Sequence, residues 1–367
     1  MSNSATSKRV FASLDGIRGL AAILVVIRHV PYFGNMWFQE TYLAVDLFFI
    51  LSGVVIANAY EQKLLSTMSV GQFVWMRVVR IFPLYLLGCL ITGICWLVIG
   101  KPDEGNTIAI IVFALLLLPN LTGRQGFPLN GPAWSLLSEM VANVVYALIV
   151  RRLTTTVLLS IMGVSLVGIV ATLLHNGSLD IGYYTKDIPY GILRVGFSFF
   201  AGVLIYRVYT ARTAWHHMIF KGHQIIPWLL LLLLLLVFIR SPAGYKNIIY
   251  DFLVITIVFP AVILLAMMFS PDRISAKVFG FLGLISYPIY VIHLPISKWI
   301  PVVFSDRAQM LATRPMWLGF SFLALLMILA WLLDRYFDVP VRRYFLKLGA
   351  GFASRRRPAA NPAASNQ

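Results

Sequence analysis

The chain has 367 residues, of which 59% are hydrophobic and only 12% are charged, and its formal net charge is +16. About a quarter of the residues are charged in an ordinary globular domain, so the composition excludes a soluble protein of the usual kind. The mean hydropathy is +0.83, and apolar runs of membrane-spanning length recur from end to end. The sequence therefore predicts an all-α, polytopic integral membrane bundle.

In chain order, the apolar runs predict about ten transmembrane helices within one membrane domain, residues 1–349. The segment 106–119 is apolar but short for a span, so we expect a re-entrant or interfacial helix there. Residues 350–367 are rich in Arg, Pro, Ala and Asn and predict a disordered tail. The expected spans are 13–32, 42–60, 81–100, 131–150, 155–175, 188–208, 225–240, 248–269, 279–303 and 316–336.

The basic excess is distributed unevenly between alternating loops. Lys and Arg gather in the loops on the side of the N-terminus, and the opposite loops hold about half as many. This bias follows the positive-inside rule and predicts that both termini are cytoplasmic in a multi-pass protein of the bacterial inner membrane. The positive charge then reflects topology and contact with membrane lipids, so we expect no nucleic-acid partner.

The first expected span contains two ionisable side chains, Arg18 and His29. An ionisable group in hydrocarbon costs several kcal/mol unless it is paired or faces a wet cavity, which makes each a candidate functional residue. A separation of eleven helical residues places them about 16 Å apart along the axis and roughly 20° apart around it. They are therefore expected on one face at two depths, as along a path through the bilayer.

Further polar residues lie in or beside the later spans. Arg77 and Arg80 are spaced i, i+3, so both guanidinium groups share one helical face. Cys89 and Cys95 fall on different faces of the third span and predict packing residues rather than a metal site. We expect no bound metal, because His216, His217 and His223 have no carboxylate or Cys at ligand spacing. The remaining candidates are Asp46, Trp134, Ser135, Glu139, Tyr287, His293 and Asp338.

Five stretches stand out together: Arg18 with His29, VDLFFxLSG around Asp46, RxxRIxPxY from Arg77 to Tyr85, WSLxxE from Trp134 to Glu139, and SYxIYxxH from Ser286 to His293. In this order they resemble the membrane acyltransferase 3 family, whose members move acyl groups onto sugars and other hydroxyl acceptors. Asp338 stands where the family often has Glu, and the additional extracytoplasmic hydrolase-like domain of some members is absent from the sequence. The resemblance covers almost the whole chain.

The resemblance implies an acyl-CoA donor, most simply acetyl-CoA, and a hydroxyl acceptor on a glycan or lipid-linked saccharide. Acyl transfer to a hydroxyl needs a base at the attacking oxygen, and a neutral, partly desolvated His29 fits that role. Arginine is suited to the phosphates of coenzyme A, so Arg18, Arg77 and Arg80 are the expected donor-binding residues. Glu139 and Asp46 are expected to orient or neutralise the polar cluster. Trp134, Ser135, Tyr287 and His293 are the expected substrate-binding residues.

Structural roles compete for several of these residues. Arg77 and Arg80 could be topology anchors at a membrane face, and Asp46 could cap the start of its span. Glu139 could bond Ser135 four residues earlier. His29 could be an interfacial histidine, and His293 a hydrogen-bonded histidine of the bundle. The tyrosines could serve packing alone, and whether Ser135 carries the acyl group covalently is open, although no GxSxG elbow surrounds it.

The main prediction is an O-acetyltransferase of a cell-envelope or exported glycan. One alternative is an acyltransferase for a secreted small molecule such as a macrolide. Another is a polytopic transporter or flippase, although no duplicated half is visible in the sequence. Binding of coenzyme A would separate an acyltransferase from a carrier.

Overall fold

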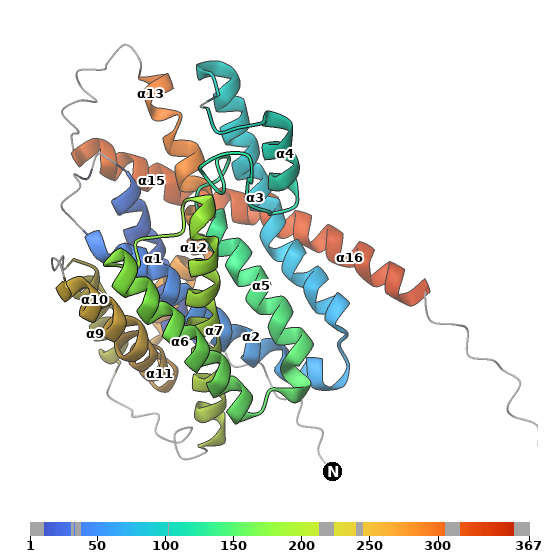
Figure 1. Ribbon diagram of the computed structural model, residues 1–367, viewed down its shortest axis with the longest axis vertical. Coiled ribbons are helices and arrows are strands. Elements are labelled where there is room, and N and C mark those ends of the chain that lie inside the picture. The colour runs from blue at the N-terminus through green and yellow to red at the C-terminus, as the bar shows by residue number, and fades with distance from the viewer. Residues whose placement is uncertain are drawn as a thin grey trace, which may run out of the picture.

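The computed structural model describes residues 11–30, 33, 38–101, 103–212, 224–239, 245–304 and 316–355. This part of the chain is built of helices and contains no β-strand, as the composition predicts; one isolated bridge joins Gln125 and Tyr184. The helices run alongside one another as a bundle, and α16 extends beyond it (Figure 1). The predicted all-α membrane fold is thus confirmed.

The helix boundaries follow the apolar runs, with short 3-10 and π segments at several ends. The 3-10 segments are Gln39–Leu43, Val150–Arg152 and Thr185–Asp187. The α-helices are α1 (Ala12–His29), α2 (Ala44–Ser66), α3 (Val70–Ile99), α4 (Thr107–Leu115), α5 (Ala133–Ile149), α6 (Thr155–Asn176), α7 (Ile188–Ala211), α9 (Ile226–Ile239), α10 (Tyr245–Leu253), α11 (Phe259–Met268), α12 (Arg273–Ser297), α13 (Ile300–Val303), α15 (Met316–Leu333) and α16 (Val339–Arg355).

Among the described residues, eight helical stretches are long and apolar enough to cross a bilayer. Two further predicted spans correspond to α1 and α9. Helix α1 carries three charged residues, Asp15, Arg18 and Arg28, within its 18 residues, and α9 has only 14 residues. Helix α1 is therefore too charged, and α9 too short, to be counted with the eight. The protein is therefore a polytopic helical membrane protein, while the count of ten spans and the cytoplasmic termini stay predictions.

Helix α3 begins well before its predicted start at residue 81. The Ser69 hydroxyl accepts a hydrogen bond from the Gln72 backbone N–H, and the Gln72 side chain accepts one from the Ser69 N–H. This reciprocal capping box satisfies two of the free donors at the helix start. Because the helix starts at Val70, Arg77 and Arg80 lie two to three turns inside a 30-residue helix instead of at its end.

Two other predicted segments differ in extent from the structure. In segment 106–119 the structure places α4, whose 9 residues are too few to span a bilayer. The last predicted span continues through a π-helical segment, Asp334–Asp338, into α16, which packs on α3 and ends at Arg355 (Figure 1). The helix thus passes the predicted domain boundary at residue 350, and residues 356–367 lie outside the described part of the chain.

Helix α1 packs chiefly on α12, and α2 packs on α7, which also contacts α5 and α6. Close approach of α2 and α7 depends on two glycines: a Cβ at Gly53 would collide with the Phe199 carbonyl, and one at Gly202 with the Ile50 carbonyl. Lipid tails are as apolar as leucine, so close packing through small residues is a principal source of helix association in a membrane.

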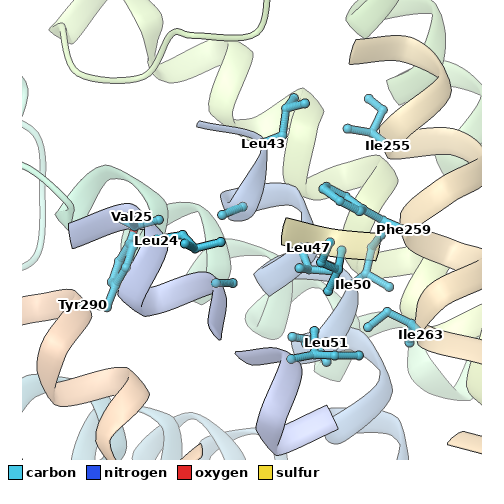
Figure 2. Close-up of a cluster of buried hydrophobic side chains, with 14 of the residues drawn as sticks. Leu24, Val25, Leu43, Leu47, Ile50, Leu51, Ile255, Phe259, Ile263 and Tyr290 are labelled. Atoms are coloured by element: carbon cyan, nitrogen blue, oxygen red, sulfur yellow. The ribbon is translucent and has the colours of Figure 1, made fainter. Parts of the chain in front are cut away.

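The largest apolar cluster joins α1, α2, α11 and α12. In Figure 2, Leu47 and Ile50 of α2 lie beside Phe259 of α11, and Val25 of α1 lies beside Tyr290 of α12. These contacts fix the position of Tyr290, which lies between the two cavities described below.

We expect Gly53→Ala to destabilise the fold by about 1–3 kcal/mol, the usual cost of overpacking a close contact. Gly93→Ala in α3 is the matched control, because nothing lies within 4 Å of the position its Cβ would occupy. Thermal unfolding in detergent is monitored by size-exclusion chromatography, and the unfolding midpoints of the two variants are compared. Equal midpoints would contradict the close α2–α7 contact.

Candidate active site

Several predicted residues line one cavity of about 180 Å3, which we call the arginine cavity. It lies between α1, α2, α3, α5 and α12. Residues distant in the sequence, from Arg18 to Tyr290, converge there. The polar side chains that matter below are Arg18, Ser52, Arg77, Arg80, Glu139 and Tyr287.

Arg18 enters this cavity from α1 and is held by α12. Its Nη2 lies 2.8 Å from Asp15 Oδ1 and 3.1 Å from the Gly283 carbonyl, and its Nε donates to Ser286 Oγ at 3.0 Å. Asp15 was not predicted, although its i, i+3 spacing from Arg18 was visible in the sequence. The guanidinium is thus fixed and partly neutralised at the cavity wall.

Arg77 and Glu139 form an ion pair across α3 and α5. Arg77 Nη2 lies 2.6 Å from Glu139 Oε1, which also accepts a hydrogen bond from Ser52 Oγ at 2.7 Å. The alternative in which Glu139 bonds Ser135 does not occur, since Ser135 Oγ instead donates to the Pro132 carbonyl. Ser52 of α2 is a partner that the sequence analysis did not single out.

Arg80 is bound by α12 and by the C-terminal helix. Its Nη1 lies 3.2 Å from Asp338 Oδ2, and its guanidinium lies over the Tyr287 ring, 4.6 Å from the centroid. Tyr287 in turn donates its hydroxyl hydrogen to the Ile81 carbonyl. Asp338, which the sequence analysis named among the polar candidates without giving it a role, therefore holds one of the cavity arginines.

His29 lines a second cavity of about 260 Å3, which we call the histidine cavity. Aromatic residues of the loop before α7 and of α5 form much of its wall, among them Trp134, Tyr183 and Tyr184. Arg28 contributes a cation and pairs with Asp180 at 2.6 Å. The cavity thus combines aromatic faces with charged hydrogen-bonding groups.

The His29 side chain is oriented by its own helix. Its Nδ1 lies 2.8 Å from the Val25 carbonyl, and a carbonyl oxygen only accepts, so Nδ1 carries the hydrogen. The lone pair of Nε2 is then available to a proton donor. This residue ends α1 and is exposed to the cavity.

His293 lies directly behind His29, with ring centroids 5.2 Å apart. It is fully buried, and its Nδ1 donates to the Tyr290 carbonyl at 2.8 Å. Its Nε2 has no hydrogen-bond partner among the described residues. His293 supports the His29 ring from within the bundle.

The two cavities meet at Val45 and Tyr290, which line both. The Tyr290 hydroxyl shares a hydrogen bond of 2.7 Å with Ser135 Oγ, and its ring makes an edge contact with Phe48. These side chains separate the space around Arg18 from the space around His29. The pair from α1 therefore lies at two depths, one residue in each cavity.

Asp46 lines neither cavity, and its carboxylate is fully buried. Its Oδ2 lies 2.6 Å from Arg194 Nη2, and its Oδ1 accepts from Ser198 Oγ at 3.1 Å. It therefore joins α2 to α7 and does not cap α2. Arg194 also donates to the Leu179 and Ile181 carbonyls, which fixes the loop beside the histidine cavity.

Arg194 was not among the predicted residues, yet the sequence contained its signal. It lies inside the predicted span 188–208, where an ionisable residue is a candidate by the same argument as Arg18. Its guanidinium also lies 5.4 Å from the centroid of Trp134.

Among the described residues, no three His, Cys, Asp or Glu side chains gather as metal ligands. His216, His217 and His223 lie outside that part of the chain.

A family model described as the acyltransferase domain matches residues 11–335, nearly the whole bundle. This chain belongs to the acyltransferase 3 family. It is accordingly a membrane acyltransferase, an enzyme rather than the transporter that the sequence left as an alternative. No solved structure matches the chain.

Three curated proteins show the range of similarity. Protein 2 in the picA locus of Rhizobium radiobacter is 40% identical over 174 residues, which cover 43% of this chain and 91% of that protein. Peptidoglycan O-acetyltransferase OatA of Listeria monocytogenes is 23% identical over 94% of this chain and 58% of its own length. Acyltransferase MdmB of Streptomyces mycarofaciens is 33% identical over 35% of this chain and 36% of its own. The chain thus spans about half or less of the latter two.

We expect Asp46→Asn to lower the free energy of unfolding by about 3–5 kcal/mol, because it leaves Arg194 buried without its counter-ion. Asp180→Asn removes the partner of Arg28 at a side chain that is 52% exposed. That control should cost less than about 1 kcal/mol. Chemical denaturation in detergent measures both, and a similar loss for the two would refute the structural importance of the Asp46–Arg194 pair.

Proposed function

We propose that the protein is an O-acyltransferase that moves an acyl group, most simply acetyl, from cytoplasmic acyl-CoA to a hydroxyl of a cell-envelope or exported glycan. The observation that carries the proposal is the pair of cavities that meet at Tyr290. One cavity presents arginines and the other presents His29 among aromatic side chains. Donor and acceptor then occupy different cavities and meet at their common wall.

The arginine cavity suits the donor. Coenzyme A is polyanionic, and Arg77 and Arg80 present guanidinium groups that can bind phosphate oxygens in pairs. Arg18 lies on the α1 side of the same cavity and is placed to contact the acyl-pantetheine arm. The positive-inside bias of the loops supports a position of this cavity on the cytoplasmic side.

The histidine cavity suits a saccharide acceptor. Trp134, Tyr183 and Tyr184 offer aromatic faces to the apolar side of a sugar ring. Arg28 and Asp180 offer charged groups to its hydroxyls. Binding sites commonly combine apolar walls with a few such oriented polar groups.

The proposed reaction needs one base and no metal. His29 Nε2 accepts the proton of the acceptor hydroxyl while that oxygen attacks the thioester carbonyl carbon. The carbon–sulfur bond then breaks, and the departing thiolate takes the proton from His29. We propose direct transfer, because Ser135 bonds the Pro132 carbonyl and Tyr290 and, in the described part of the chain, has no histidine or carboxylate as a hydrogen-bond partner to activate it.

The other predicted site residues have distinct proposed roles. Glu139 holds Arg77 in position, and Asp46 acts through Arg194 on the wall of the histidine cavity. Ser135 and Tyr287 line the arginine cavity and so contact the donor. His293 positions the His29 ring.

Two acceptor classes are compatible with these relatives. The peptidoglycan O-acetyltransferase of Listeria aligns along 94% of this chain, which favours an envelope glycan. The Streptomyces protein, which aligns over 35% of this chain, is described only as an acyltransferase, so a secreted small molecule stays the second candidate.

We expect His29→Ala to lower transfer by roughly 10²- to 10⁴-fold, the usual contribution of a positioned base. A strain lacking the gene is complemented with wild type, His29→Ala or His175→Ala, and ester-linked acyl groups on envelope and secreted glycans are quantified by mass spectrometry. His175 is exposed near the end of α6 and lines neither cavity, so it is the matched control.

Wild type and His175→Ala should restore the ester, and His29→Ala should not. An ester restored by His29→Ala would remove this residue from the role of base. A glycan ester profile that does not change on deletion would overturn the glycan acceptor and favour a secreted small molecule.

We expect Arg77→Gln combined with Arg80→Gln to weaken coenzyme A binding roughly 10- to 100-fold, because charge-assisted hydrogen bonds to phosphate are lost. The salt dependence of the dissociation constant should also become shallower, since salt screens such contacts. Arg151→Gln with Arg152→Gln is the control, because both arginines are exposed and line neither cavity. Calorimetry on detergent-purified protein measures both pairs, and equal affinities would make Arg77 and Arg80 membrane anchors.

A further inference from the structure

A third cavity, of about 360 Å3, lies between α2, α3 and α16; we call it the α16 cavity. It shares Val55, Arg77 and Arg80 with the arginine cavity. The arginine pair therefore borders both cavities. Arg342 and Arg343, on the first turns of α16, complete its polar lining.

The charges around this cavity are arranged asymmetrically. Among the residues that the structure describes, four arginines line it, Arg77, Arg80, Arg342 and Arg343, and no carboxylate does. The carboxylate that binds Arg80 and Arg342 belongs to Asp338, which is fully buried behind them. The carboxylates thus bind the guanidinium groups from the protein interior, and the side chains that face the cavity with a charge are arginines.

A π-helical segment produces this arrangement. Residues Asp334–Asp338 form it between α15 and α16, and such bulges commonly mark functional positions in helices. Asp338 accepts from both Arg80, at 3.2 Å, and Arg342, at 3.0 Å. Two guanidinium groups thus converge on one buried carboxylate oxygen, and Arg342 also lies 3.6 Å from Asp334 Oδ1, so both arginines are held from the protein side.

Arg343 differs from its three neighbours because it has no ion pair or hydrogen bond among the described residues. It is exposed at the cavity. Met76, Val79 and Leu346 give the same cavity an apolar wall. The combination of cations and an apolar wall fits an anion attached to a flat apolar group.

We propose that the α16 cavity binds the nucleotide end of the acyl donor, with Arg343 contacting its 3′-phosphate monoester. The inference rests on the proposed function. The thioester must lie near Tyr290 at the inner wall of the arginine cavity, so the nucleotide end extends past Arg80 into the α16 cavity. A phosphate monoester carries close to two negative charges at neutral pH, and an unpaired arginine is its strongest partner among side chains.

The test uses two ligands that differ in one group: coenzyme A and 3′-dephospho-coenzyme A. Full-length wild type, Arg343→Gln and Lys347→Gln are reconstituted in nanodiscs of neutral phosphatidylcholine, and dissociation constants are measured by calorimetry. Lys347 is the matched control, because it lies one turn further along α16, is exposed and does not line the cavity.

Wild type and Lys347→Gln should bind coenzyme A about tenfold more tightly than the dephospho form, the value of one charge-assisted contact. Arg343→Gln should lose that preference by weakening only coenzyme A. Equal affinity of wild type for both ligands would overturn the subsite while leaving the donor intact. Equal weakening of both ligands by Arg343→Gln would also overturn it, as a general effect of charge.

Two further outcomes separate the remaining explanations. If wild type binds neither ligand, the proposed donor fails and the subsite fails with it. A parallel series in nanodiscs with anionic lipid tests the other source of phosphate, a lipid headgroup. If Arg343→Gln alters ligand binding only in the anionic discs, Arg343 is a lipid contact and the inference is wrong.

Discussion

The cost of placing an ion in an apolar bundle governs this structure. A charged side chain among membrane helices must be paired or face water, and the Asp46–Arg194 contact at 2.6 Å satisfies this rule with both partners buried. Arg194 then uses its remaining donors on the Tyr42, Leu179 and Ile181 carbonyls. One pair thereby sets the position of α2 against α7 and of a loop against the bundle.

The ion pairs at the cavities serve packing and function together. Glu139 is held by Arg77 and Ser52, and Asp338 by Arg80 and Arg342. Each carboxylate fixes an arginine that still contributes to a cavity wall. A bound polyanion would meet guanidinium groups whose orientation is already determined, which reduces the entropy lost on binding.

The cavities also explain how one membrane bundle can keep two reactants apart. Tyr290, held by Ser135, contacts both spaces, and apolar residues of α1 and α2 pack against its ring. Tight packing of this kind changes between discrete arrangements rather than deforming continuously. Passage of an acyl group from one cavity to the other therefore depends on the side chains at this wall.

The sequence by itself determined the fold class, most of the helix positions and the separation of Arg18 from His29, because hydrophobic length and helical geometry are local properties. It also contained the family motifs. It did not determine which polar residues pair, because Arg194, Asp180 and Ser52 each bind a partner that is distant in the sequence. The start of α3 was misplaced and the π-helical segment Asp334–Asp338 was missed for a related reason. Only the tertiary structure decides such contacts, since burial and partners depend on how whole helices pack.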